Sequence, residues 1–267
     1  MSLDIIKAII LGIVEGLTEF LPVSSTGHLI LTNALLPNTG NKEFWETFEI
    51  VIQLAAILAV VVLYFKRFIH GFEIYKKLLL AFIPTGILGF IYAHFHMKEF
   101  LFNPAVVSSS LIVGGVILIM LDKWSAKKES KYASLEAIPA SSAMKIGLIQ
   151  SISMIPGVSR AAATILGGIY NGFNRRQATE FSFLLAVPTM FVASGYELWK
   201  AKDNLDKSHI NLLLIGSLVA FVFAMLAVKG FINFLVKYGF KGFGYYRIII
   251  GVLALILFYY FNFRFEK

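Results

Sequence analysis

The chain has 267 residues, of which 58% are hydrophobic and 15% are charged, and its mean hydropathy is +0.76. This balance excludes a soluble protein and indicates one integral membrane unit, built from apolar segments with short polar connections. The formal charge of +8 does not predict a nucleic-acid partner, because the Lys and Arg residues lie between apolar segments and form no basic face interleaved with aromatic residues.

The first predicted element is a broken apolar region at residues 3–36. It is interrupted at Pro22-Val-Ser-Ser-Thr-Gly27, where Pro removes a helical hydrogen-bond donor and Gly loosens the backbone. We expect two short helices there, which enter the membrane and return as a re-entrant hairpin. Polar groups at membrane depth are costly, so the carboxylates, hydroxyls and histidine between residues 15 and 28 indicate a functional site.

Six uninterrupted apolar stretches come next, in two sets of three. Each is long enough to cross a hydrocarbon core of about 30 Å, which requires about 20 helical residues. A second broken region, residues 144–170, separates the sets and is interrupted at Pro156-Gly-Val-Ser-Arg160. The stretches are 48–65, 78–95 and 104–121 before that region, and 180–199, 212–228 and 243–263 after it. The sequence thus predicts an all-α integral membrane protein with six transmembrane helices plus two re-entrant helical hairpins.

The Lys and Arg residues predict the orientation of these segments, because cytoplasmic loops carry an excess of both. When alternate connections are assigned to the inside, they hold about twice as many Lys and Arg residues as the outside connections. The loop at 38–46 is then outside and the loop at 122–145 inside, so the hairpins enter from opposite sides, as in an inverted repeat. We interpret the chain as one polytopic domain, 1–267, with repeat halves at 1–121 and 122–267.

Two carboxylates open the polar cluster of the first broken region. Glu15 and Glu19 are four residues apart, so on a helix they share a face and repel each other. The chain has no cysteine, which leaves carboxylates, histidine and hydroxyls as the available chemistry. A hard divalent cation such as Mg²⁺ or Ca²⁺, held beside a phosphate group, is the natural partner of such a pair. The alternative is that the two carboxylates only line a wet interfacial surface.

Hydroxyl residues begin the second arm of the first hairpin. Ser24, Ser25 and Thr26 suit ordinary N-capping, but the same helix N-terminus presents free N–H groups and a positive dipole to an anion such as phosphate. His28 follows two residues into that helix and could act on a bound anion as a nucleophile or proton donor. We interpret His28 as functional, because Glu, Ser and Gly residues surround it.

The second broken region places a cation where a helix starts. Arg160 opposes the helix dipole at that position, so local stability does not explain it, whereas its guanidinium suits bidentate binding of phosphate. Its charge would complement Glu15 and Glu19 if the two hairpins meet at mid-membrane. Thr164 lies four residues on, shares a face with Arg160 and could add a hydroxyl. A buried Arg–Glu ion pair without a substrate is the alternative.

The two motifs resemble those of the undecaprenyl-diphosphate phosphatase family, the bacitracin-resistance proteins of bacterial inner membranes. They are Glu15-Gly-Leu-Thr-Glu19-Phe-Leu-Pro-Val-Ser-Ser-Thr-Gly-His28 and Pro156-Gly-Val-Ser-Arg160-Ala-Ala-Ala-Thr164, and the similarity continues through Glu180 to Pro188. The resemblance implies the same fold of six spanning helices and two re-entrant hairpins, with a site open to the periplasm. It also implies hydrolysis of undecaprenyl diphosphate, assisted by a divalent cation, in recycling the lipid carrier of peptidoglycan synthesis.

Carried over by position, the resemblance implies an acidic motif that binds the cation, two catalytic candidates and a diphosphate-binding loop. The acidic motif is Glu15 and Glu19, and the catalytic candidates are Ser25 and His28. The diphosphate-binding loop is Ser159, Arg160 and Thr164, and further substrate-binding candidates are Ser24, Thr26 and Gly157. The chain departs from the family at Ala161, where many members have Ser. That departure weakens any role for a hydroxyl at this position but leaves Arg160 and Thr164 in register.

The expected mechanism combines these groups. Arg160 and the helix N-termini would hold the diphosphate, and Glu15 with Glu19 would position the cation. Either His28 or Ser25 attacks the terminal phosphorus or activates a water, and we favour His28. A secondary transporter or flippase of prenyl phosphate lipids is the rival, since inverted repeats and broken helices are typical of transporters. The density of phosphate-type chemistry in two short motifs favours the enzyme, and the oligomeric state stays open, a homodimer included.

Overall fold

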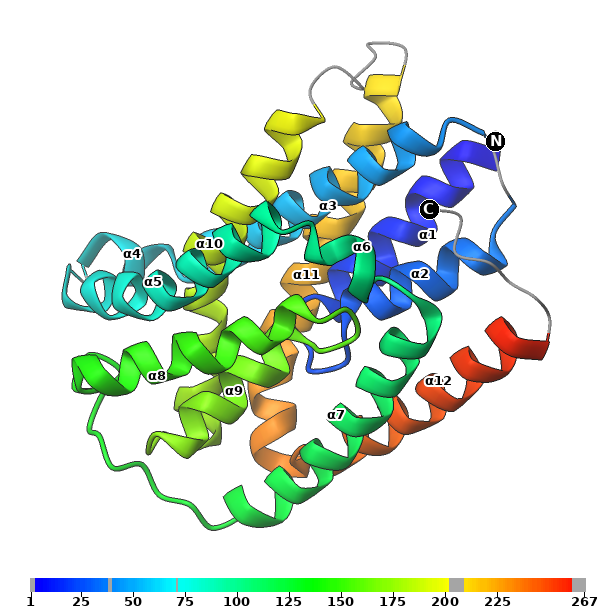
Figure 1. Ribbon diagram of the computed structural model, residues 1–267. Helices are drawn as coiled ribbons and strands as arrows, with labels where there is room; N and C mark the ends of the chain where they lie inside the picture. The colour runs from blue at the N-terminus through cyan, green and yellow to red at the C-terminus, as the bar shows by residue number, and fades with distance from the viewer. Residues whose placement is uncertain (1–2, 38–39, 71, 202–208, 261–267) are drawn as a thin grey trace.

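The computed structural model describes residues 3–37, 40–70, 72–201 and 209–260 (Figure 1). Within these ranges every regular element is a helix, which confirms the predicted all-α class. Residues 38–39 of the connection predicted to lie outside, and residues 261–263 of the last predicted span, lie beyond the described parts of the chain.

The described residues contain six helices that are long and apolar enough to cross a membrane. They are α3 (Lys42–Leu63), α5 (Phe72–His94), α7 (Pro104–Ser125), α10 (Arg175–Lys200), α11 (Ile210–Tyr238) and α12 (Lys241–Tyr260). The six predicted spans are therefore confirmed, but most helices extend beyond the predicted apolar stretches. An apolar stretch marks the hydrocarbon-facing part of a helix, whereas its ends are set by caps: the Asn174 side chain accepts a hydrogen bond from the Gln177 N–H at 2.9 Å and starts α10 before residue 180.

The two broken regions each form a pair of short helices, as predicted. The first consists of α1 (Leu3–Thr18) and α2 (Ser25–Leu35), and the second of α8 (Ala140–Gln150), a 3₁₀ turn (Ser151–Met154) and α9 (Arg160–Tyr170). The longest of these arms has 16 residues. At about 1.5 Å per residue it is shorter than the hydrocarbon core. Arms of this length suit the predicted re-entrant hairpins. Short helices α4 (Phe65–His70) and α6 (Met97–Leu101) connect the spans.

The first arm of each hairpin packs on a span from the other half of the chain. Helix α1 lies along α11, and α8 lies along α5, while α3 packs on α10 and α7 lies beside α12 (Figure 1). Gly147 of α8 permits one of these close approaches, because a Cβ at this position would overlap the backbone carbonyl of Ala81 in α5. This reciprocal packing brings the two broken loops toward each other.

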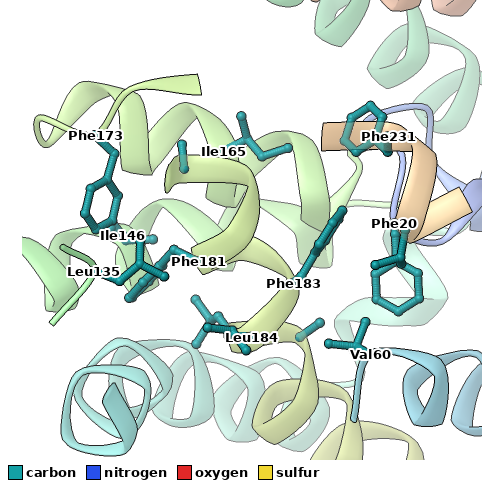
Figure 2. Close-up of a cluster of buried hydrophobic side chains, with 14 of the residues drawn as sticks. Phe20, Val60, Leu135, Ile146, Ile165, Phe173, Phe181, Phe183, Leu184 and Phe231 are labelled. Carbon is teal, nitrogen blue, oxygen red and sulfur yellow. The ribbon is translucent and has the colours of Figure 1, made fainter. Parts of the chain in front are cut away.

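Aromatic packing anchors the first loop to the second half of the molecule. Phe20, which follows α1, meets Phe183 of α10 edge-on with ring centroids 5.6 Å apart, and both side chains are fully buried. Phe231 of α11 lies 6.1 Å from Phe183, and Figure 2 shows these rings in one buried apolar cluster. The segment that carries Glu19 is therefore held against α10 by its neighbouring residue.

Candidate active site

A polar cavity of about 160 Å³ lies where the two broken loops meet. Glu19, Ser24, Ser25, Thr26, Gln53, Ser153, Val158, Ser159, Arg160 and Met190 line it. Six of these ten were predicted from the sequence as site residues. A second cavity of about 230 Å³, lined in part by Tyr64, Arg176 and Lys229, contains none of the predicted site residues. The chemistry therefore points to the smaller cavity.

An ion pair joins the two hairpins at this cavity. Arg160 Nη2 lies 3.0 Å from Glu19 Oε1, although the residues are 141 positions apart in the chain. Both side chains are almost completely buried, with 11% and 4% of their surface exposed. Ser25 Oγ donates to the other carboxylate oxygen of Glu19 at 2.5 Å. The expected meeting of the hairpins is thus observed, and Glu19 is bound from both sides.

Arg160 is fixed by groups that leave one of its donors unused. Ser159 caps α9 by accepting from the Ala162 N–H at 3.2 Å, and Arg160 Nη1 donates to the Ser182 carbonyl at 3.0 Å. The Nε–H group of Arg160 is buried and has no hydrogen-bond partner among the described residues. An unsatisfied buried donor is costly. The guanidinium beside the cavity therefore has a place for an acceptor oxygen, in addition to its ion pair.

Glu15 has unsatisfied acceptor oxygens, the counterpart of the unsatisfied donor of Arg160. It is fully buried one helical turn before Glu19, and within the described parts of the chain neither of its carboxylate oxygens has a hydrogen-bond partner. An isolated buried carboxylate cannot stay charged without a cation. A hard divalent cation would suit this donor chemistry, and Glu15 and Glu19 are the carboxylates that would hold it. The described residues hold no group of three His, Cys, Asp or Glu side chains able to bind a metal, so oxygens of substrate or water would complete the shell.

Ser24 starts α2 in a strained conformation. Its φ of 72° is left-handed, and its Oγ accepts from the Gly27 N–H at 3.3 Å, so the predicted capping role is confirmed. A non-glycine residue in this region costs about 1–3 kcal/mol and persists only where its surroundings hold it. The strained turn aims the first residues of α2, Ser25 and Thr26, at the cavity.

His28 lies beside the cavity and is not one of its lining residues. Its Nδ1 lies 2.8 Å from the Ser24 carbonyl, which can only accept, so this nitrogen carries the proton. Its Nε2 therefore accepts from the Tyr246 hydroxyl of α12, at 2.7 Å, and the two rings stack with centroids 5.5 Å apart. His28 is thus held by hydrogen bonds at both nitrogens.

Glu15 does not line the cavity, and two other predicted residues, Thr164 and Gly157, are likewise outside its lining. Thr164 Oγ1 donates back to the Arg160 carbonyl at 2.9 Å and lies 2.5 Å from the Ser182 hydroxyl, so it braces α9 against α10. Gly157 has a left-handed φ of 89°, and its carbonyl accepts from Arg247. Neither residue lines the cavity, and direct contact of either with a substrate stays a prediction.

The sequence did not identify Ser153 or Tyr246 as site residues. Ser153 belongs to the 3₁₀ turn after α8, and isolated serines in apolar segments carry no distinguishing pattern. Tyr246 reaches His28 across 218 positions of the chain, a contact that only the packing of α12 reveals. The neighbouring Arg247 could have pointed to this region, because a charged residue inside a predicted span indicates a functional site.

Known proteins resemble this chain over almost its whole length. A family model described as bacitracin resistance protein BacA matches residues 8–253. A protein of Wolinella succinogenes is 51% identical over 95% of this chain and 98% of its own length, and one of Bdellovibrio bacteriovorus is 48% identical over 95% and 96%. A protein of Aquifex aeolicus is 49% identical over 94% of this chain and 98% of its own. All three are named undecaprenyl-diphosphatase.

Proposed function

The chain belongs to the bacitracin resistance protein BacA family, and on that premise we propose that it is an undecaprenyl-diphosphatase. The reaction converts undecaprenyl diphosphate to undecaprenyl phosphate and phosphate, in recycling the lipid carrier of peptidoglycan synthesis. The observation that carries the proposal is the guanidinium of Arg160. It is fixed at a buried polar cavity by Glu19 and the Ser182 carbonyl, and its Nε–H has no partner among the described residues.

The donors around the cavity support binding of a diphosphate. The first residues of α2 and α9 both line it, so the positive ends of two helix dipoles face the same small volume. The hydroxyls of Ser25, Thr26 and Ser159 add hydrogen-bonding groups. A polar cavity of about 160 Å³ suits phosphoryl groups, and the prenyl tail would lie along exposed apolar faces of the spanning helices.

The pairing of Ser25 with Glu19 supports a nucleophilic mechanism. Ser25 Oγ forms a bond to the terminal phosphorus while the bond from that phosphorus to the bridging oxygen breaks. Glu19 accepts the Ser25 proton and passes it to the departing undecaprenyl phosphate. Water then attacks the phosphoserine and gives a proton to Glu19, which returns it to Ser25 as phosphate leaves. Arg160 stabilises the charge that develops on the phosphoryl oxygens.

His28 and the acidic pair complete this assignment. The sequence favoured His28 as the primary acid-base or nucleophilic group, and that role stays a prediction. In the structure its Nδ1–H donates to the Ser24 carbonyl, so we assign it a part in holding the first turn of α2. A divalent cation, Mg²⁺ or Ca²⁺, bound by Glu15 and Glu19 would neutralise charge on the diphosphate. Glu15 is suited to this role because its buried carboxylate has no partner within the described residues.

The six spanning helices make this a multi-pass membrane protein. We place it in the bacterial inner membrane with the cavity open to the periplasm, an assignment that the distribution of Lys and Arg and the family support. A homodimer stays a prediction, which the mass of the purified protein in detergent tests.

The deciding experiment separates an enzyme from a flippase. Purified protein in detergent, where no membrane exists to transport across, should release phosphate from undecaprenyl diphosphate. Ser25→Ala and Arg160→Ala should each lower the rate by roughly 10² to 10⁴. Arg67→Ala, which removes a half-exposed Arg away from the cavity, is the matched control. If no phosphate appears, while proteoliposomes move undecaprenyl phosphate between leaflets, the protein is a flippase instead.

A further inference from the structure

A buried arginine on the last helix contacts both broken loops. Arg247 of α12 is only 1% exposed. Its Nη1 donates to the Pro22 carbonyl at 3.0 Å, in the first loop, and its Nη2 donates to the Gly157 carbonyl at 2.9 Å, in the second. The same guanidinium donates to the carbonyls of Ser110 and Leu111 in α7, at 3.0 and 3.3 Å. One side chain thus joins two loops and a spanning helix.

Burying the charge of Arg247 costs free energy, so its position calls for an explanation. A cation buried at membrane depth pairs with a carboxylate or with backbone carbonyls, and it usually marks a functional site. Among the described residues no carboxylate pairs with Arg247, and its guanidinium donates to four backbone carbonyl oxygens. The two loop carbonyls lie outside helices, so they have no helical donor of their own to satisfy them.

The two loop carbonyls lie close in sequence to the groups of the candidate site. Pro22 precedes Ser24 by two positions and Ser25 by three, and Gly157 precedes Arg160 by three. The guanidinium is rigid and planar, so its two Nη atoms fix the separation of the carbonyls they bind. We propose that Arg247 is a positioning residue, which holds the two loops in register so that Ser25 and Arg160 face one phosphoryl group. The proposal rests on the phosphatase function proposed above.

Helix α7 is shaped to accommodate this guanidinium. A Cβ at Gly114 would lie 2.7 Å from Arg247 Cζ, so only glycine leaves room for the side chain in its present position. Helices α7 and α12 lie side by side along their length (Figure 1). Gly114→Ala should therefore displace the guanidinium while keeping the arginine. Gly242→Ala on α12 is the matched control, because no heavy atom lies within 4 Å of its Cβ.

The first test measures phosphate release in detergent. Arg247→Lys and Gly114→Ala should each lower kcat at least 10-fold with KM changed less than about 3-fold, because a misplacement of about 1 Å at the reacting atoms costs roughly 10² in rate. Gly242→Ala should keep the wild-type kcat. If an active wild-type protein and both variants share one kcat, Arg247 has no positioning role and only this inference fails.

The second test measures the accessibility of a thiol in the second loop and needs no enzymatic turnover. It therefore remains informative if the proposed function is wrong. The chain has no cysteine, so Val158→Cys places a single thiol in the second loop, at the cavity. Its alkylation rate should rise several-fold when Gly114→Ala or Arg247→Lys is added, because the Gly157 carbonyl loses its donor. It should be unchanged by Gly242→Ala. Equal alkylation rates in all four proteins would show that Arg247 does not hold the loop.

Discussion

Among single residues, Glu15 is the least satisfied group of the site. Its carboxylate is fully buried, no described residue offers it a hydrogen bond, and Glu19 lies one turn away with both oxygens already bound. Because burial disfavours a lone negative charge, Glu15 needs either a proton or a cation. A cation beside Glu15 would supply the positive charge that its carboxylate lacks.

The cation proposal predicts that a chelator abolishes phosphate release and that added Mg²⁺ or Ca²⁺ restores it. Glu15→Gln should lower kcat and raise the cation concentration needed for half-maximal rate, while the yield of folded protein stays the same, since an amide of equal size replaces a carboxylate without partners. Glu73→Gln, which changes an exposed carboxylate on α5, is the control. Full activity in excess chelator removes the metal from the mechanism.

The strained turn at Ser24 gives a prediction of stability. Ser24→Ala should lower the free energy of unfolding by about 1 kcal/mol, because the N-cap is lost while the left-handed φ of 72° remains. Ser24→Gly should cost only a few tenths of a kcal/mol, since glycine tolerates that φ. Unfolding of the purified protein in mixed micelles measures both. A glycine variant less stable than the alanine variant contradicts the account of this turn.

Among the helices, the sequence predicted the interruptions of the two broken regions better than it predicted the ends of the spanning helices. Both broken regions were visible without a structure because Pro22 and Pro156 are accompanied by Gly and hydroxyl residues. Proline alone is not enough, since Pro84 and Pro188 lie inside the continuous helices α5 and α10. Helix ends depend on caps and on polar turns that extend out of the apolar stretch, so α5 begins at Phe72 rather than 78. The pairing of hairpin arms with spans depends on close approaches such as that at Gly147. The apolar pattern of a helix does not specify which other helix it packs against.

The orientation of the helices predicts the outcome of thiol labelling. Single cysteines at Lys42 and Lys127, both exposed, report on the two ends of the spans. Lys127 is preferable to Lys128, whose ammonium donates to the Ile169 carbonyl at 2.6 Å. A membrane-impermeant thiol reagent applied to intact cells should label Lys42→Cys and spare Lys127→Cys. The opposite labelling would reverse the orientation and place the predicted outside loop in the cytoplasm.

At the scale of the whole molecule, the packing is reciprocal. Helix α1 lies on α11 as α8 lies on α5, and the last helices of the two predicted halves, α7 and α12, lie side by side (Figure 1). A duplicated unit in opposite orientations would produce these pairings. The predicted boundary between residues 121 and 122 falls inside α7, which is one continuous helix to Ser125, so a division into halves would come after that helix. The division itself stays a prediction.

The sequence also predicted which motifs meet, but not what holds them together. Complementary charge indicated that Arg160 would approach the acidic pair, and it binds Glu19. The roles of Tyr246 and Arg247 depended on where α12 packs, and nothing local in an apolar span specifies that partner. Sequence reasoning therefore reached the groups with unusual chemistry and missed those whose importance comes from tertiary position.

If the two hairpins build one phosphatase site, a double-mutant cycle on phosphate release should show that one residue from each hairpin acts on the same group. Glu19→Ala and Arg160→Ala remove the two partners of the 3.0 Å ion pair, one from each hairpin. Each should lower kcat/KM by roughly 10² to 10⁴. Because they act on the same phosphoryl group, the double variant should be no more than about 3-fold slower than the worse single variant. A double variant whose loss equals the product of the two single losses would contradict a shared site.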